Sequence, residues 1–148
     1  KTFNVAGLAV CWAVVTDPAL RARFQAAIAG VSDHPNILGL IATEAALEHG
    51  EPWRRDLMIY LRQNRDTLVD FIRTRCPGLS IRPGEATYLA WIDASGLGLE
   101  KPAEHFEKKD GLFLSDGAFF GWPRHIRFNF GCPRARMLEG LEKIAAAI

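Results

Sequence analysis

The stretch HIRFNFGCPR, residues 125–134, decides the fold of this chain. If residues 125–130 form a strand, His125, Arg127 and Asn129 share one face and the apolar residues between them share the other. Pro133 then begins a final helix with an apolar side. A strand with one apolar face, followed at once by such a helix, predicts helices packed on a sheet.

Arg127 is the first candidate functional residue. An arginine in mid-strand between apolar neighbours is held rigidly, and its planar group of donors suits a carboxylate bound by two parallel hydrogen bonds. The alternatives are a solvated arginine on an edge strand and an arginine paired with an internal acid.

The residues before this stretch complete an α/β pattern. A long amphipathic helix is expected from Pro52 to the Cys76-Pro77-Gly78 stop, with a short helix over residues 101–109. Strands are expected over residues 79–81, 87–92 and 112–114, and Ser115-Asp116-Gly117 is expected to be a turn. This order predicts helices packed on a small sheet, in one domain that covers residues 51–148.

Residues 1–50 have a different character. Val5 to Val15 is apolar without alternation, which favours a strand buried on both faces. One helix is expected between the Asp17-Pro18 cap and Gly30, and another between Pro35 and Gly50. We therefore divide the chain into a terminal segment (1–16), connecting helices (17–50) and the domain of residues 51–148.

Composition excludes several classes of function. The 148 residues are 49% hydrophobic and 24% charged, with a net charge of +1, so neither nucleic acid nor an anionic membrane is an expected partner. The longest apolar run is too short to span a membrane. The three cysteines are far apart and the four histidines lack ligand spacing, so we expect no metal site and a cytoplasmic location.

Lys1 has two interpretations. A lysine amine can act as a nucleophile towards a carbonyl group when its surroundings favour the neutral form. The residues around it in KTFN do not provide such surroundings, so a flexible terminal lysine is the simpler interpretation from composition alone.

Four motifs occur in a characteristic order: KTFNVAGL at residues 1–8, EATYLAWID at 85–93, LSDGAFFG at 114–121 and RFNFGCPR at 127–134. Together they resemble the C-terminal part of fold-type I pyridoxal-phosphate enzymes, specifically the aminotransferase-like carbon–sulfur lyases of the cystathionine β-lyase type. The resemblance covers essentially the whole chain. It implies a small C-terminal domain of a PLP-dependent transferase-like fold, preceded by the last strand of the large cofactor domain.

The resemblance also implies roles for individual residues. Lys1 matches the lysine that holds pyridoxal 5'-phosphate and moves the proton at Cα, and Arg127 matches the arginine that binds the substrate α-carboxylate. Tyr88 falls where relatives have residues close to the substrate. Ala9 stands where many aminotransferase relatives have an arginine that holds the cofactor phosphate, so this chain departs from their pattern there.

The implied activity belongs to the full-length enzyme, a homodimer that acts on a small-molecule amino-acid substrate of the cystathionine or cysteine-S-conjugate type. It is cleavage of a Cβ–S bond to give pyruvate, ammonia and a thiol. The aromatic and acidic cofactor contacts of the family lie upstream of its lysine, so we expect this chain to be an inactive fragment. The alternatives are an aminotransferase of class I/II and a non-catalytic α/β module.

Overall fold

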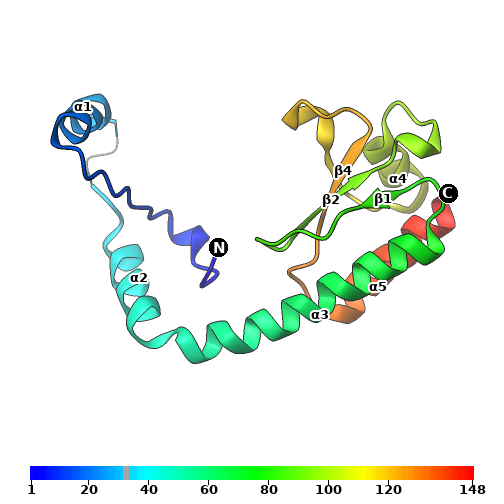
Figure 1. The fold of residues 1–148 in the computed structure, drawn as a ribbon, viewed down its shortest axis with the longest axis horizontal. Coiled ribbons are helices and arrows are strands. Elements are labelled where there is room, and N and C mark those ends of the chain that lie inside the picture. The colour runs from blue at the N-terminus through cyan, green and yellow to red at the C-terminus, as the bar shows by residue number, and fades with distance from the viewer. Residues whose placement is uncertain (32–33) are drawn as a thin grey trace. The chain divides into compact units, whose positions relative to one another are not determined.

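The computed structural model describes residues 1–31 and 34–148, which form two compact units, Lys1–Asp56 and Leu57–Ile148. Figure 1 shows the second unit as a small sheet with helices and the first as irregular chain and helices. The long helix α3, Glu51–Arg75, begins in the first unit and continues in the second. No helix in the described ranges is long and apolar enough to cross a membrane.

A four-stranded antiparallel sheet organises the second unit. Its strand order is β1-β2-β4-β3, and β4 pairs with β2 along its whole length, with Trp91 opposite Arg127. The strand predicted from the alternation in residues 125–130 is therefore confirmed as β4. The strand bounds are β1 Ser80–Ile81, β2 Leu89–Asp93, β3 Ser115–Asp116 and β4 His125–Asn129.

One face of this sheet is the core face. It presents Ala90, Ile92, Ile126 and Phe128, which are buried in one cluster with apolar residues of the helices. The helices that contribute to the cluster are α3, α4 (Pro102–Asp110) and α5 (Arg134–Ala147). We call the opposite face, which carries Trp91, His125 and Arg127, the outer face.

Helices α3 and α5 lie side by side (Figure 1). Arg75 near the end of α3 donates to Glu142 of α5 at 2.8 Å, and Arg134 at the start of α5 donates to Asn64 of α3 at 3.0 Å. Leu68 and Ile72 of α3 and Leu141 of α5 are fully buried. The apolar stripe predicted for the long helix therefore packs into the core that the sheet and α5 share.

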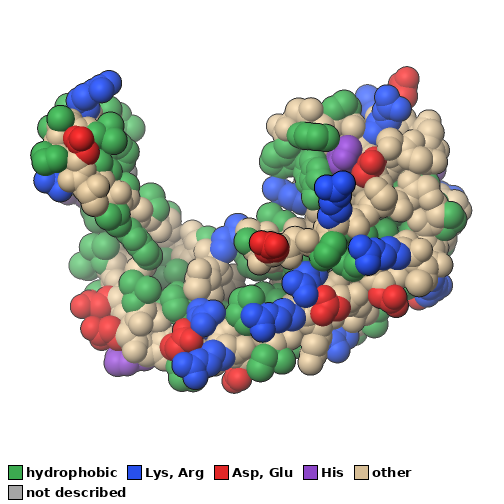
Figure 2. All heavy atoms as spheres, in the orientation of Figure 1, with side chains coloured by type: hydrophobic (Ala, Val, Ile, Leu, Met, Phe, Trp, Pro, Cys, Tyr) green, Lys and Arg blue, Asp and Glu red, His purple; other side chains and the backbone are tan. Residues whose placement is uncertain are grey.

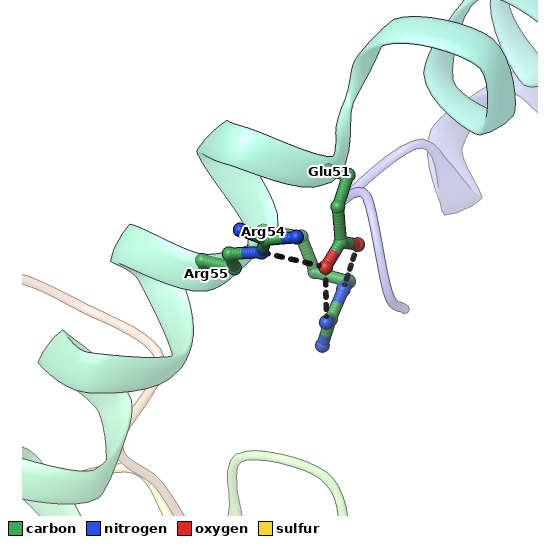
Figure 3. A network of polar contacts seen from close by, with 3 residues as sticks. All are labelled: Glu51, Arg54 and Arg55. Atoms are coloured by element: carbon green, nitrogen blue, oxygen red, sulfur yellow. Dashed lines mark hydrogen bonds and ion pairs between the residues drawn. The ribbon is translucent and has the colours of Figure 1, made fainter.

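The helix signals of the sequence correspond closely to the observed helix ends. Asp17 caps α1, Pro18–Ile28, by accepting a hydrogen bond from the Leu20 amide at 2.8 Å. Helix α2, Ile37–His49, is capped by Asn36 instead of beginning at Pro35. Helix α3 starts at Glu51, whose carboxylate accepts hydrogen bonds from Arg54 and Arg55 (Figure 3).

The prediction of a buried strand over residues 5–15 is wrong. This segment contains a 3₁₀ helix, Ala6–Leu8, followed by irregular chain, and Trp12 and Val14 are 66% and 81% exposed. A strand needs a neighbour that accepts and donates its backbone hydrogen bonds. Within residues 1–31 and 34–148, no segment pairs with residues 5–15 in this way.

The segment after α4 also differs from its prediction. The strand is not at residues 112–114 but at Ser115–Asp116, the first two residues of the predicted turn, where Ser115 lies opposite Arg127. The chain instead turns through the 3₁₀ helix Gly117–Phe120, which Asp116 caps by accepting from the Ala118 amide at 2.8 Å. Leu114 is buried, so its apolar character reflects the core instead of strand pairing.

Candidate functional site

Lys1 lies at the wall of a hollow in the first unit. The hollow measures about 580 Å³, and Lys1 is the one charged residue among the described residues that line it. Its carbonyl oxygen accepts a hydrogen bond from the Asn4 amide at 3.1 Å, and the ring of Phe3 lies 6.5 Å from that of Trp53 on α3. Residues 1–4 are therefore packed onto the rest of the first unit, and Lys1 is exposed at the surface of that unit.

Ala9 lines the same hollow and has a left-handed backbone conformation, with φ of 52°. A residue with a Cβ atom is disfavoured there by about 1–2 kcal/mol. The methyl group of Ala9 cannot bind a phosphate. The first unit therefore presents an exposed lysine at a mostly apolar hollow, and the described lining adds no second cation to it.

Arg127 lies on β4, which is flanked by β2 on one side and β3 on the other, so it is not on an edge strand. Its Nη2 donates to the Ser115 hydroxyl at 3.0 Å, and its guanidinium lies 4.8 Å from the centre of the Phe120 ring. Its Nε is buried and has no hydrogen-bond partner among the described residues, and none of their carboxylates pairs with it. For the described residues, the structure therefore excludes both alternative interpretations of Arg127: a solvated arginine on an edge strand, and an arginine paired with an internal acid.

The surroundings of Arg127 are aromatic and hollowed. On the outer face, Trp91 stacks on His125 with ring centres 5.6 Å apart, and Trp122 meets His125 edge-on at 5.2 Å. Arg127 and Ser115 line two hollows of about 500 and 380 Å³. An arginine that lines open space and lacks an acid partner among the described residues is suited to an external anion.

Tyr88 lies in the same unit but on the core side. Its ring packs against the hydrophobic core, close to Gly131, and its carbonyl oxygen accepts from the Phe130 amide at 2.9 Å. Arg127 projects from the outer face, so the structure does not place these two side chains together. The role of Tyr88 near the substrate stays a prediction.

A network around Asn64 was missed by the sequence analysis. The side chain is fully buried on α3, and its amide nitrogen donates to the carbonyl oxygens of Phe130 and Cys132, each at 3.1 Å. Its oxygen accepts from Arg134 Nε, while Tyr60 accepts from the Arg134 amide at 2.7 Å. These contacts fix the loop between β4 and α5. The signal in the sequence was Asn64 itself, because a polar residue within the apolar stripe of a helix indicates a buried hydrogen-bond network.

The thiols near the core are not candidate nucleophiles. Burial raises the pKa of both Cys76 and Cys132 above the ordinary thiol value. A thiol with a raised pKa is protonated at neutral pH, and the thiolate is the reactive form.

The sheet, its helices and Arg127 define an α/β domain with an arginine on the outer face of its sheet, beside two hollows. The chain matches the model of the aminotransferase class I and II family over residues 1–144, and it belongs to that family.

Curated relatives carry lyase names. The chain is 32% identical over 154 residues to "Cystathionine beta-lyase PatB" of Bacillus subtilis, and 30% identical over 150 residues to "Cystathionine beta-lyase" of Corynebacterium glutamicum. Each match covers 100% of this chain and 40% of the relative. The chain thus spans about 40% of the length of these relatives.

Solved structures agree with the fold. The structure named "OvoB" is 46% identical with a TM-score of 0.95, and covers 99% of this chain and 38% of its own. The "PLP-bound C-S lyase from Staphylococcus hominis" is 34% identical with a TM-score of 0.88, and covers 99% of this chain and 39% of its own. Both structures share the observed helices and sheet, and the second is of a PLP-bound enzyme, as the motifs predicted for the fold.

Proposed function

We propose that this chain is the C-terminal part of a PLP-dependent carbon–sulfur β-lyase, which cleaves the Cβ–S bond of an amino acid of the cystathionine or cysteine-S-conjugate type. The products would be pyruvate, ammonia and a thiol. The observation that carries the proposal is Arg127, which lines two hollows, has no carboxylate partner among the described residues, and matches the family arginine that binds the substrate carboxylate. The lyase names of relatives matched over the whole chain support the same reaction.

The residues of this chain fit the aldehyde end of the cofactor but not its phosphate end. Lys1 offers an exposed amine on a hollow, which suits covalent attachment to an aldehyde. The phosphate has no cationic partner in the described lining of that hollow, and Ala9 cannot provide one. We propose that the phosphate contacts come from parts of the enzyme outside this chain.

Each residue then has a defined task. Lys1 would hold the cofactor, and its amine would also move the proton at the substrate Cα. Arg127 binds the α-carboxylate and so sets the direction of the Cα–H bond. Pyridoxal phosphate, when bound, withdraws electrons from Cα, and a thiolate can then leave from Cβ.

The organisation of the enzyme follows as part of the proposal. Residues 1–16 would belong to the large cofactor-binding domain, and residues 51–148 would be the small domain. Residues 17–50 would connect these two domains. We propose that the enzyme is a cytoplasmic homodimer. The three free cysteines, one of them exposed, support a reducing compartment.

The second candidate is an aminotransferase, which the family description favours and which needs the same two residues. The intact protein should be given cystathionine, and pyruvate and free thiol measured beside keto-acid formation with an added acceptor. The lyase predicts pyruvate and thiol in equal amounts. Keto acid that depends on the acceptor, without thiol, would establish the aminotransferase, and neither product would favour the non-catalytic module.

A further inference from the structure

We propose that Ser115 and Phe120 are positioning residues, which together hold the guanidinium of Arg127 in the orientation that binds a carboxylate. This inference rests on the proposed function, because it takes Arg127 as the carboxylate site.

The two residues restrain the guanidinium in different directions. Ser115 lies opposite Arg127 in the strand register, and its hydroxyl accepts from Nη2 at 3.0 Å, which fixes rotation within the plane of the group. Phe120 presents its ring to the guanidinium at 4.8 Å, which fixes the tilt of that plane. The buried Nε is left without a partner among the described residues.

The turn that presents Phe120 is itself tightly constrained. It follows directly from Ser115, and a Cβ atom on Gly117 would collide with the carbonyl oxygens of Trp122 and His125, so the turn requires glycine there. Trp91 meets the Phe120 ring edge-on, with centres 5.7 Å apart. The ring is therefore held between the indole of Trp91 and the guanidinium of Arg127.

Neighbouring cations do not compete for the same anion. Arg136 and Lys143 line the larger hollow together with Arg127. However, Arg136 pairs with Glu139 at 2.9 Å, and Lys143 donates to the carbonyl oxygen of Asp110 at 3.1 Å. Among the described residues of this lining, Arg127 is the cation that contacts a hydroxyl and an aromatic ring instead of a carboxylate or carbonyl oxygen. Fixing its orientation in advance lowers the entropy lost when a carboxylate binds.

The test measures carboxylate binding without catalysis. Acetate is titrated into the intact protein while the Nε–H resonance of Arg127 is followed by NMR, and the resonance is assigned by its loss in Arg127→Lys. Ser115→Ala and Phe120→Leu should each weaken acetate binding about threefold to tenfold, because each removes one restraint. Ser115→Thr and Phe120→Tyr retain the hydroxyl and the ring, so they should bind acetate as the unsubstituted protein does.

Phe119→Leu is the matched control, since Phe119 is adjacent to Phe120 but is 88% exposed, and the ring that the Arg127 guanidinium contacts is that of Phe120. Equal acetate affinity in Ser115→Ala, Phe120→Leu and Phe119→Leu would overturn the inference. So would an Arg127 resonance that acetate does not move in the unsubstituted protein. Turnover of cystathionine is measured separately, and its absence together with the expected acetate results would contradict the lyase and not the positioning role.

Discussion

The two units of this chain have similar proportions of apolar residues but bury them to different extents. In the unit of residues 57–148, the side chains of Leu68, Ile92 and Ile144 are inaccessible to solvent. In the unit of residues 1–56, Gly39 is the sole buried residue among those described. Figure 2 shows hydrophobic side chains at the surface of the first unit as well as the second. Helices therefore form in both, but a continuous core forms where there is a sheet to pack against.

This difference distinguishes the helices, which local hydrogen bonds can form, from the core, which needs packing between elements. Asp17 and Asn36 cap α1 and α2 by short-range hydrogen bonds, and such contacts need no core. The apolar side chains of these two helices have little to pack on within the described residues. Since the chain spans about 40% of its curated relatives, we expect the remainder of the enzyme to cover them.

The largest effect should come from truncating matched leucines in the two units. Leu68 is fully buried on α3, whereas Leu38 on α2 is 65% exposed. In the 148-residue chain, Leu68→Ala should lower the free energy of unfolding by about 2–5 kcal/mol, because it leaves a cavity. Leu38→Ala should change it by less than about 0.5 kcal/mol. Urea denaturation measures both, and equal losses would contradict the contrast between the units.

A smaller effect is expected at two asparagines. Asn64→Ala removes the partner of two carbonyl oxygens and of Arg134, and should cost about 1–3 kcal/mol in the same measurement. Asn36→Ala removes a helix cap that accepts from the Leu38 amide at 3.0 Å, and should cost about 1 kcal/mol. A larger loss at Asn36 than at Asn64 would show that the first unit depends on its polar contacts more than the second.

The smallest effect concerns Glu51, at the exposed start of α3. Hydrogen bonds from Arg54 and then Arg55 lower its pKa from 4.5 to about 2 (Figure 3). Because the folded pKa is the lower one, the stabilisation is complete above pH 4.5 and is lost as the pH falls towards 2. An NMR titration of the Glu51 carboxyl carbon should therefore have a midpoint well below 4.5. Arg54→Gln should raise that midpoint, and an ordinary midpoint in the unsubstituted chain would contradict the ion-pair cluster.

Much of the second unit could be predicted from the sequence, because its signals are local. The alternation around Arg127 identified β4, and the proline and glycine positions bounded α3 and α4. Register could not be predicted in the same way. Whether Leu112–Leu114 or Ser115–Asp116 pairs with β4 depends on which side chains fill the core, and both segments are short.

The candidate site was predicted only in part. The types and positions of Lys1 and Arg127 could be inferred from motifs, whereas Ser115, Phe120 and Asn64 act through contacts with residues distant in the sequence. Ser115 lies 12 residues from the arginine that it contacts, and Asn64 lies 66 residues from Phe130. The buried strand over residues 5–15 was predicted from composition alone, and composition does not show whether a partner strand is available.

The central claim is that Lys1 holds the cofactor, and one measurement tests it most directly. The intact protein is loaded with pyridoxal phosphate and treated with borohydride, which makes permanent any bond between a lysine amine and the aldehyde. It is then digested for peptide mass spectrometry. The account predicts the added pyridoxyl group on Lys1, and no labelled peptide from Lys1→Ala. A pyridoxyl group on another lysine, with Lys1 unmodified, would contradict it.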